Sequence, residues 1–282
     1  MSFTRRSAIL TASAAALTVT ASPALAAPFA WQSRSGLSTG QYQALFNQLT
    51  AQGYRLALVD GYNVDGNATF AAIFNQTGGP AWVAHHNMNA GQFQQTFDQL
   101  GAQGYRLTKV SGYGPGGVPL YAGLWTQSGG PAWQARSGLT SGQFQQVFDQ
   151  LTAQGYRPVW VNGYNVAGVP YFAAIFEQIA NSPAWISRHG MTAPQYQAAF
   201  DAAVAQGYHL RMVSGYAVGP VAYFAAIWDQ GSFPAWQARH NLNTADFQAA
   251  FDALTQQGMR LVDVSGYEVG GQVLYAGLWI NG

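Results

Sequence analysis

The sequence predicts an α+β fold made of five tandem units of about 51 residues, each with one helix and an antiparallel β-hairpin. Two series of residues indicate the repeat. Tryptophans recur at intervals of 51 or 52 positions: Trp31, Trp82, Trp133, Trp185 and Trp236. Glycines keep the same interval: Gly53, Gly104, Gly155, Gly207 and Gly258. We therefore expect units at approximately 31–81, 82–132, 133–184, 185–235 and 236–282, within a single domain over residues 27–282.

The third unit shows why each repeat should begin with a helix. Thr140 and Gln143 have the spacing of a capping box, with Thr140 as N-cap. Phe144, Phe148 and Leu151 then recur at helical spacing. Gly155 follows where the end of a helix favours a left-handed residue. A helix of about 12 to 14 residues is predicted in every unit.

A β-hairpin is predicted after each helix. In the second unit, the extended runs 105–113 and 120–125 flank a Gly/Pro-rich turn. The second run of each pair is apolar on both faces, as in residues 172–176, so both faces should be covered, with helices on one side of the sheet. The segment around each repeated tryptophan is either a further short strand or a link, which makes the unit β-α-β-β or α-β-β. The tryptophan would be a wedge between neighbouring units.

Neither terminal unit resembles a cap. An open solenoid needs polar terminal repeats, yet the first unit keeps Tyr42 and Phe46 and the last keeps Phe251 and Trp279. These residues favour a closed or nearly closed ring with pseudo-five-fold symmetry. The alternative is an open curved trough that dimerises through its ends.

Residues 1–26 are typical of an export signal. Arg5 and Arg6 precede an uncharged stretch that ends in Ala24-Leu25-Ala26, and the pattern fits either a twin-arginine or a general secretory signal. We therefore expect a secreted protein. No later segment has the roughly 18 consecutive apolar residues of a membrane span.

Composition excludes several partners. Without Arg5 and Arg6, ten basic residues remain against eleven acidic ones, so binding to nucleic acid is not expected. The chain has no cysteine, which excludes disulfides and thiolate metal sites. No cofactor is predicted, and the sequence leaves the oligomeric state open.

Candidate binding residues lie where the repeats differ. One position in the first hairpin strand changes from unit to unit while its neighbours barely change, and this position holds Leu58, Lys109, Trp160, Met212 and Asp263. By alternation, these residues share a face with the strand tyrosines. If that face lines the axis or a groove, they form a mixed aromatic and charged surface for a ligand. The alternative is that they are merely exposed to solvent.

The other repeated polar residues have a structural interpretation. Asp98, Asp149, Asp201 and Asp252 lie late in their helices, where the dipole disfavours a negative charge, so we expect salt bridges to nearby arginines such as Arg106, Arg157, Arg136 or Arg239. His86, His189 and His240 share one repeat position that is serine in the other units. No metal site is predicted, because the histidine and carboxylate spacings match no known ligand pattern.

The sequence also lacks the common catalytic motifs. It contains no Gly-x-Ser-x-Gly, Ser-x-x-Lys, His-Glu-x-x-His or Walker motif, and no catalytic residue is predicted. Only two glutamates are present, Glu177 and Glu268. An enzyme is therefore not the favoured interpretation.

The repeat resembles the bacterial tandem repeat domains. The matching residues are 133–140, 154–157, 214–216 and 225–228, and the resemblance covers the whole chain after the expected signal, residues 27–282. Similar repeats form the non-catalytic N-terminal region of polyglycine hydrolases, which are secreted endopeptidases whose nucleophile lies in a Ser-x-x-Lys motif of another domain. Because this chain lacks that motif, the resemblance implies a secreted repeat module and not the peptidase activity.

Three functions remain open after these observations. The first is a secreted, non-catalytic binding module that recognises an extended polymer, either a glycan or a Gly-rich peptide, or a protein partner. The second is a secreted hydrolase with an unrecognised site. The third is an accessory or structural module related to the non-catalytic part of polyglycine hydrolases.

Overall fold

The computed structural model describes residues 29–282, so the export signal expected at residues 1–26 lies outside the described residues. Each unit contains three strands and one helix in the order β-α-β-β. The helices are α1 (Thr39–Ala51), α2 (Ala90–Ala102), α3 (Ser141–Ala153), α4 (Ala193–Ala205) and α5 (Thr244–Gln256).

The strands form five groups of three. Those of the first two units are β1 (Trp31–Ser38), β2 (Arg55–Val64), β3 (Asn67–Asn75), β4 (Trp82–Met88), β5 (Arg106–Tyr113) and β6 (Leu120–Thr126). Those of the third and fourth units are β7 (Trp133–Thr140), β8 (Arg157–Val166), β9 (Val169–Glu177), β10 (Trp185–Thr192), β11 (Tyr208–Val218) and β12 (Val221–Gln230). The fifth unit has β13 (Trp236–Asn243), β14 (Met259–Val269) and β15 (Gln272–Asn281).

Helix boundaries follow from local chemistry. In α3, Thr140 is the N-cap and forms the predicted capping box with Gln143. The helix ends at Ala153 with Gln154 as C-cap, and Gly155 then takes a left-handed φ of 82°, which glycine adopts without steric cost. Each of the five helices has 13 residues, which confirms the predicted length.

Each unit has its own antiparallel sheet, and the last strand of the unit lies in the middle. The order is β1-β3-β2 in the first unit and is equivalent in the other four. This order explains why residues 70–74 of β3 are apolar throughout: both edges are paired and both faces are covered. The segment around each repeated tryptophan is a strand, so the β-α-β-β order is confirmed and the α-β-β alternative is wrong.

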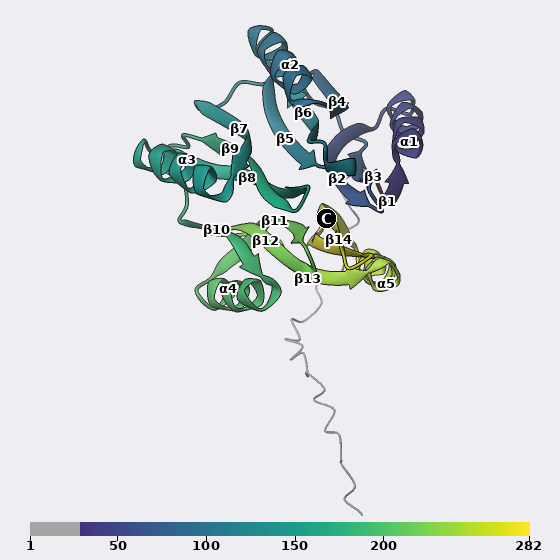
Figure 1. Cartoon of the computed structure of the whole chain (residues 1–282). Helices are drawn as coiled ribbons and strands as arrows, with labels where there is room; N and C mark the ends of the chain where they lie inside the picture. The colour runs from purple at the N-terminus through teal and green to yellow at the C-terminus, as the bar shows by residue number, and fades with distance from the viewer. Residues whose placement is uncertain (1–28) are drawn as a thin grey trace, which may run out of the picture.

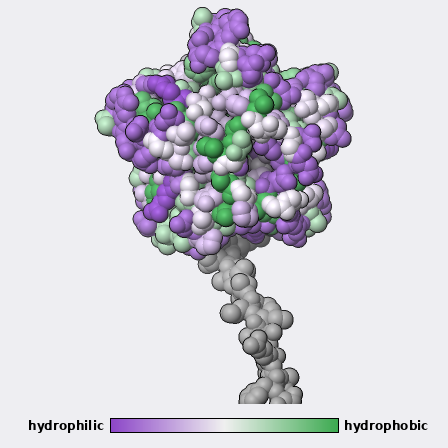
Figure 2. Space-filling model, in the orientation of Figure 1, coloured by the Kyte–Doolittle hydropathy of each residue, from purple (hydrophilic) through white to green (hydrophobic). Residues whose placement is uncertain are grey.

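The five units lie around a common centre, with the helices on the outside and the strands β2, β5, β8, β11 and β14 inside (Figure 1). In the space-filling view the outline has five lobes with hydrophilic tips (Figure 2). Each unit contacts the next along the chain, and the fifth unit also contacts the first. Strands pair only with strands of their own unit, and within residues 29–282 no sheet extends from one unit to another.

A repeated hydrogen bond joins neighbouring units near the centre. The backbone N–H of one glycine in each unit donates to a buried polar side chain of the next unit. The pairs are Gly61 to Ser111, Gly112 to Asn162, Gly163 to Ser214, Gly215 to Ser265, and Gly266 to Asp60, at 2.7 to 3.1 Å. The last of these bonds links the fifth unit to the first.

A tyrosine ring from the next unit packs directly against each of these glycines. A Cβ atom on Gly112 would lie 2.4 Å from the ring of Tyr164, closer than any packed atoms approach. Equivalent contacts occur at all five junctions, including Gly266 with Tyr62. Glycine is therefore required here by close packing and not by backbone conformation.

The repeated tryptophans pack at the outer part of each junction. Trp133 lies edge-on to Phe97 of the preceding helix, with ring centroids 5.5 Å apart. Trp31 makes the equivalent contact with Phe251, at 5.6 Å, so this contact also joins the last unit to the first. These geometries are those expected of a wedge between units. Within residues 29–282, no helix combines the length and hydrophobicity that crossing a membrane requires.

Candidate functional site

The five variable residues predicted as a binding surface lie on the inner strands and are directed to the interior. Leu58, Trp160, Met212 and Asp263 are buried, with at most 7% of each side chain exposed, whereas Lys109 is half-buried. Leu58, Trp160 and Met212 belong to one apolar cluster with the strand tyrosines Tyr62 and Tyr164, as the predicted alternation requires. They are not the freely exposed residues of the alternative interpretation. A ligand in solvent does not reach the four buried side chains directly.

Lys109 and Trp160 form a close contact within this cluster. The Nζ atom of Lys109 lies 3.7 Å from the centre of the Trp160 ring, which is the geometry of a cation–π interaction. The indole N–H of Trp160 donates to the carbonyl of Val110, 2.7 Å away, and this bond fixes the ring. Burial lowers the pKa of Lys109 to about 8, partly opposed by the negative charge of Asp263, while Arg211 acts in the same direction as burial.

Two buried carboxyl groups lie near the same centre. Burial raises the pKa of Asp263 to about 6, opposed by Lys109 and by the backbone N–H groups of Val213 and Val264. Burial also raises the pKa of Asp60 well above its usual range, although the N–H of Gly266 donates to it. The interior thus holds one lysine and two carboxyl groups that do not titrate at their ordinary pH values.

At the hairpin end of the inner strands is a depression of about 180 Å³, which we call the axial hollow. Every unit contributes to it. Its lining comprises residues 60–63, 112–113, 162–165, 215–217, 219 and 266–268. The glycines and tyrosines of the repeated junction contacts form much of this surface, so the contacts that hold the units together also shape the hollow.

The polar side chains of the axial hollow are held in place by hydrogen bonds between units. One carboxylate oxygen of Glu268 accepts from the N–H of Asp65, at 2.9 Å. The side-chain oxygen of Asn63 accepts from the N–H of Gly114, at 3.1 Å. The side-chain amide of Asn165 donates to the carbonyl of the next unit, at 2.6 Å. The lining contains the acidic residues Asp60 and Glu268 and no Lys, Arg or His.

Sequence reasoning missed these hollow residues although a signal was present. The position after the repeated Gly-Tyr also changes between units, and it holds Asn63, Gly114, Asn165, Ala217 and Glu268. Four of the five line the axial hollow. Comparing the units five positions further along the strand would have identified them.

The predicted salt bridges of the helix aspartates are wrong. Asp98, Asp149, Asp201 and Asp252 each accept instead from the glutamine one turn earlier in the same helix, at 2.8 Å. Two of the four arginines pair with carboxylates at the end of the middle strand of the next unit: Arg106 with Glu177, at 2.9 Å, and Arg157 with Asp229. Arg136 and Arg239 instead donate to carbonyl and glutamine oxygens of their own strands.

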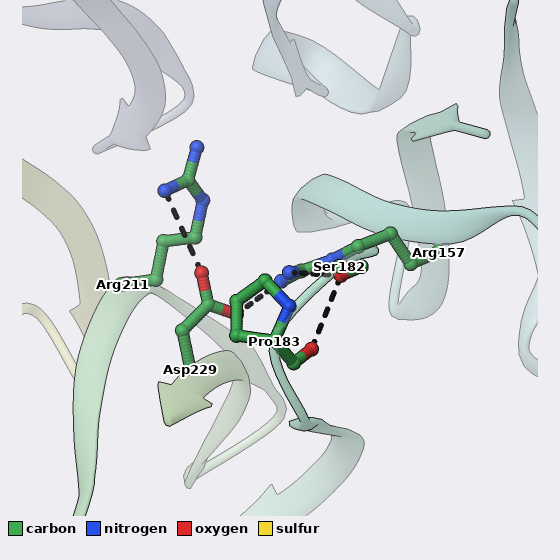
Figure 3. Close-up of polar contacts among 5 residues, drawn as sticks. All are labelled: Arg157, Ser182, Pro183, Arg211 and Asp229. Carbon is green, nitrogen blue, oxygen red and sulfur yellow. Dashed lines mark hydrogen bonds and ion pairs between the residues drawn. The ribbon is translucent and has the colours of Figure 1, made fainter. Parts of the chain in front are cut away.

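Figure 3 shows one of these junctions. Arg157 of the third unit reaches Asp229 of the fourth and donates a second bond to Ser182, at 3.0 Å. Arg211 approaches the other oxygen of the same carboxylate, at 3.6 Å. Asp229 is therefore shared by two cations at the boundary between units.

The repeated histidines lie in junctions between units. His86 packs edge-on against the ring of Tyr42 in the preceding helix, at 4.9 Å, and burial lowers the pKa of its imidazole. His189 and His240 are placed equivalently. In residues 29–282, no group of three His, Cys, Asp or Glu side chains has a geometry suited to a metal ion.

The comparison with protein families agrees with this architecture. The family described as the polyglycine hydrolase-like structural repeat matches five times, at residues 29–77, 79–128, 130–179, 182–231 and 233–281. Each match covers one β-α-β-β unit, and together they span most of the chain. The chain therefore belongs to the polyglycine hydrolase-like structural repeat family and is a repeat module related to the non-catalytic region of those enzymes.

Proposed function

We propose that this protein is a secreted, non-catalytic binding module that holds one segment of an extended polymer in the axial hollow. The observation that carries the proposal is the lining of the hollow, to which all five units contribute. A site that exists only when the units are assembled is typical of a function that belongs to the whole module. The secreted location follows from the expected signal at residues 1–26.

The chemistry of the lining limits the ligand. Asp60 and Glu268 place carboxyl groups at the hollow, and no cationic side chain is present in the lining to attract an anion. Tyrosine pairs stack beside it, Tyr164 with Tyr171 at 6.0 Å and Tyr216 with Tyr223 at 5.8 Å. A ligand with hydroxyl or amide donors and a flat, uncharged surface fits this combination of groups.

A neutral glycan or a Gly-rich peptide is therefore the favoured ligand class, and polymers of uronic acid or phosphate are disfavoured. The volume of about 180 Å³ suits a single sugar ring or a short piece of peptide backbone, with the rest of the polymer outside. The five variable residues at the centre, Leu58, Lys109, Trp160, Met212 and Asp263, would act beneath the hollow by fixing the relative position of the strands.

A binding array with matched variants tests the proposal. The full chain is applied to neutral glycans, acidic glycans and Gly-rich peptides, and positive ligands are titrated by calorimetry. Ala217→Trp places an indole in the hollow, whereas Val169→Trp adds the same side chain at an exposed hairpin position outside it. We expect Ala217→Trp to weaken binding at least about tenfold and the control to change it less than about twofold.

Two results would overturn the proposal. One is the absence of binding to every neutral polymer. The other is binding that Ala217→Trp leaves intact. Incubating each bound polymer with the protein and measuring new chain ends also separates binding from the hydrolase alternative, which requires products that accumulate with time.

A further inference from the structure

A second hollow lies at the junction between the second and third units, away from the axial hollow. Junctions of this kind form where the helix of one unit faces the first strand of the next. At three of the five, a histidine packs against the helix. Its ring centroid lies 4.9, 4.6 or 4.9 Å from the aromatic ring of Tyr42, Phe144 or Tyr196.

The junction between α2 and β7 has Ser137 at the histidine position and is open. Its cavity of about 330 Å³, which we call the lateral pocket, reaches the buried side chains of Leu107 and Val110 on the inner strand β5. Hollows of about 430 and 360 Å³ also lie at the α3–β10 and α1–β4 junctions, but His189 and His86 line them and no residue of an inner strand does. Ser137 and its neighbours in this junction therefore leave open the way to the inner strand that the imidazole covers at the α3–β10 and α1–β4 junctions.

Neighbouring residues keep the lateral pocket from being filled by other side chains. Trp125 lies against Gly123, where a Cβ atom would come within 2.3 Å of the indole, and against Phe93 at a centroid distance of 5.9 Å. The ring of Tyr121 stacks on Phe93, with centroids 5.0 Å apart, and its hydroxyl is bonded to that of Tyr164, at 2.9 Å, so this ring stays outside the lining of the pocket. The small residue Ser137 thus leaves a space that its neighbours do not fill.

We propose that the lateral pocket binds a small aromatic acid. The ring would take the place that an imidazole has at the other junctions, against Phe93 and above Leu107 and Val110. Arg136 is the one charged residue in the lining and is exposed at the mouth, where it would receive the carboxylate. Gln94 and Ser137 provide further hydrogen-bonding groups in the lining. An apolar pocket with a few polar groups is the usual form of a small-molecule site.

Benzoate is the probe for this site, and its binding to the full chain is followed by the shifts of the indole N–H signals in two-dimensional NMR. We expect saturable binding that selectively shifts the signal of Trp125, because its ring contacts Phe93 at the wall of the pocket. Benzyl alcohol, which has the ring without the charge, should bind about tenfold more weakly. The variant Arg136→Gln should reduce the affinity for benzoate to a similar degree.

Ser137→His is the decisive variant because it recreates the packing of three natural junctions and should therefore fold. We expect it to abolish benzoate binding and to leave the melting temperature unchanged or higher. Ala135→Leu partly fills the same pocket and serves if Ser137→His fails to fold. His189→Ser, at another junction, should leave the benzoate site unaffected.

The inference would be overturned by any of three outcomes: no saturable shift with benzoate, equal affinity for Ser137→His or Ala135→Leu and the unmodified chain, or shifts confined to residues far from α2. The axial hollow and the lateral pocket share no lining residue, so this test and the polymer array succeed or fail independently.

Discussion

The backbone N–H of Gly266 donates to the carboxylate of Asp60 at 2.7 Å, although 206 positions separate the two residues in the sequence. The four other junctions have the same bond with a serine or asparagine as acceptor. Among these five glycine bonds, the one between the last unit and the first is thus the one with an ionisable acceptor. The strength of this bond should therefore depend on pH, unlike that of the four other glycine bonds.

Asp60→Asn and Asp60→Ala should have opposite effects on stability at neutral pH. Asparagine keeps an acceptor for Gly266, as Asn162 does for Gly112, and removes a charge that is costly to bury. We expect Asp60→Asn to raise the free energy of unfolding. Alanine leaves the buried N–H of Gly266 without an acceptor and should lower the free energy of unfolding by about 1–3 kcal/mol. Urea unfolding at pH 7 measures both.

The gain in unfolding free energy of Asp60→Asn over the unmodified chain should become smaller at acidic pH. Because the pKa of Asp60 is raised by folding, the folded state binds its proton first, and the unmodified chain gains stability as the pH falls below the folded pKa towards about 4. An advantage that stays constant between pH 7 and pH 4 would show that Asp60 is not buried as a charge.

Gly112→Ala should destabilise the protein by about 1–3 kcal/mol, because the new methyl group would lie 2.4 Å from the ring of Tyr164. Gly142→Ala is the matched control. Gly142 lies in the first turn of α3 with no neighbouring atom within 4 Å, so alanine there should be neutral or stabilising by about 0.5–1 kcal/mol. Equal losses from the two substitutions in thermal unfolding would contradict the packing of Tyr164 on glycine.

Lys109→Met should raise the pKa of Asp263 above its value of about 6. Lys109 is the main charge that opposes the effect of burial on this carboxyl group. Methionine is the residue that the fourth unit has at the same position, Met212, so the substitution should be tolerated sterically. Titration of the Asp263 carboxyl carbon by NMR measures the shift. A pKa that does not change would mean that the ammonium group does not act on Asp263.

The sequence predicted what depends on neighbours within a unit. The capping box at Thr140 and the turn at Gly155 are set by residues a few positions apart, and both are found as expected. The shared face of Leu58 and Tyr62 follows from strand alternation and is also found. The fifth unit contacts the first through Gly266 and Asp60, as the apolar terminal units suggested.

Contacts between units were harder to predict because their geometry is set by the whole assembly. Asp98 was expected to pair with an arginine, yet its helix faces outward, and Arg106 instead meets Glu177 of the next unit, 71 positions away. Variation between units identified Lys109 and Trp160 as special but could not show that their face turns to a packed centre. The same variation at Asn165 and Glu268 marks the axial hollow.

His189 and His240 should make the protein less stable as the pH falls below about 6.5. Burial against aromatic rings lowers the pKa of both imidazoles, so the unfolded chain binds these protons first. The stability loss therefore begins near the unfolded pKa of about 6.5 and stops at the lower folded pKa, with a slope of at most about 1.4 kcal/mol per pH unit for each histidine. His189→Gln should make the decline between pH 6.5 and pH 5 shallower, as measured by urea unfolding at each pH. Because Asp60 and Asp263 are unchanged in this variant, their opposite pH dependence cancels in the difference. A decline as steep as in the unmodified chain would mean that His189 accepts a proton in the folded state as readily as in the unfolded one.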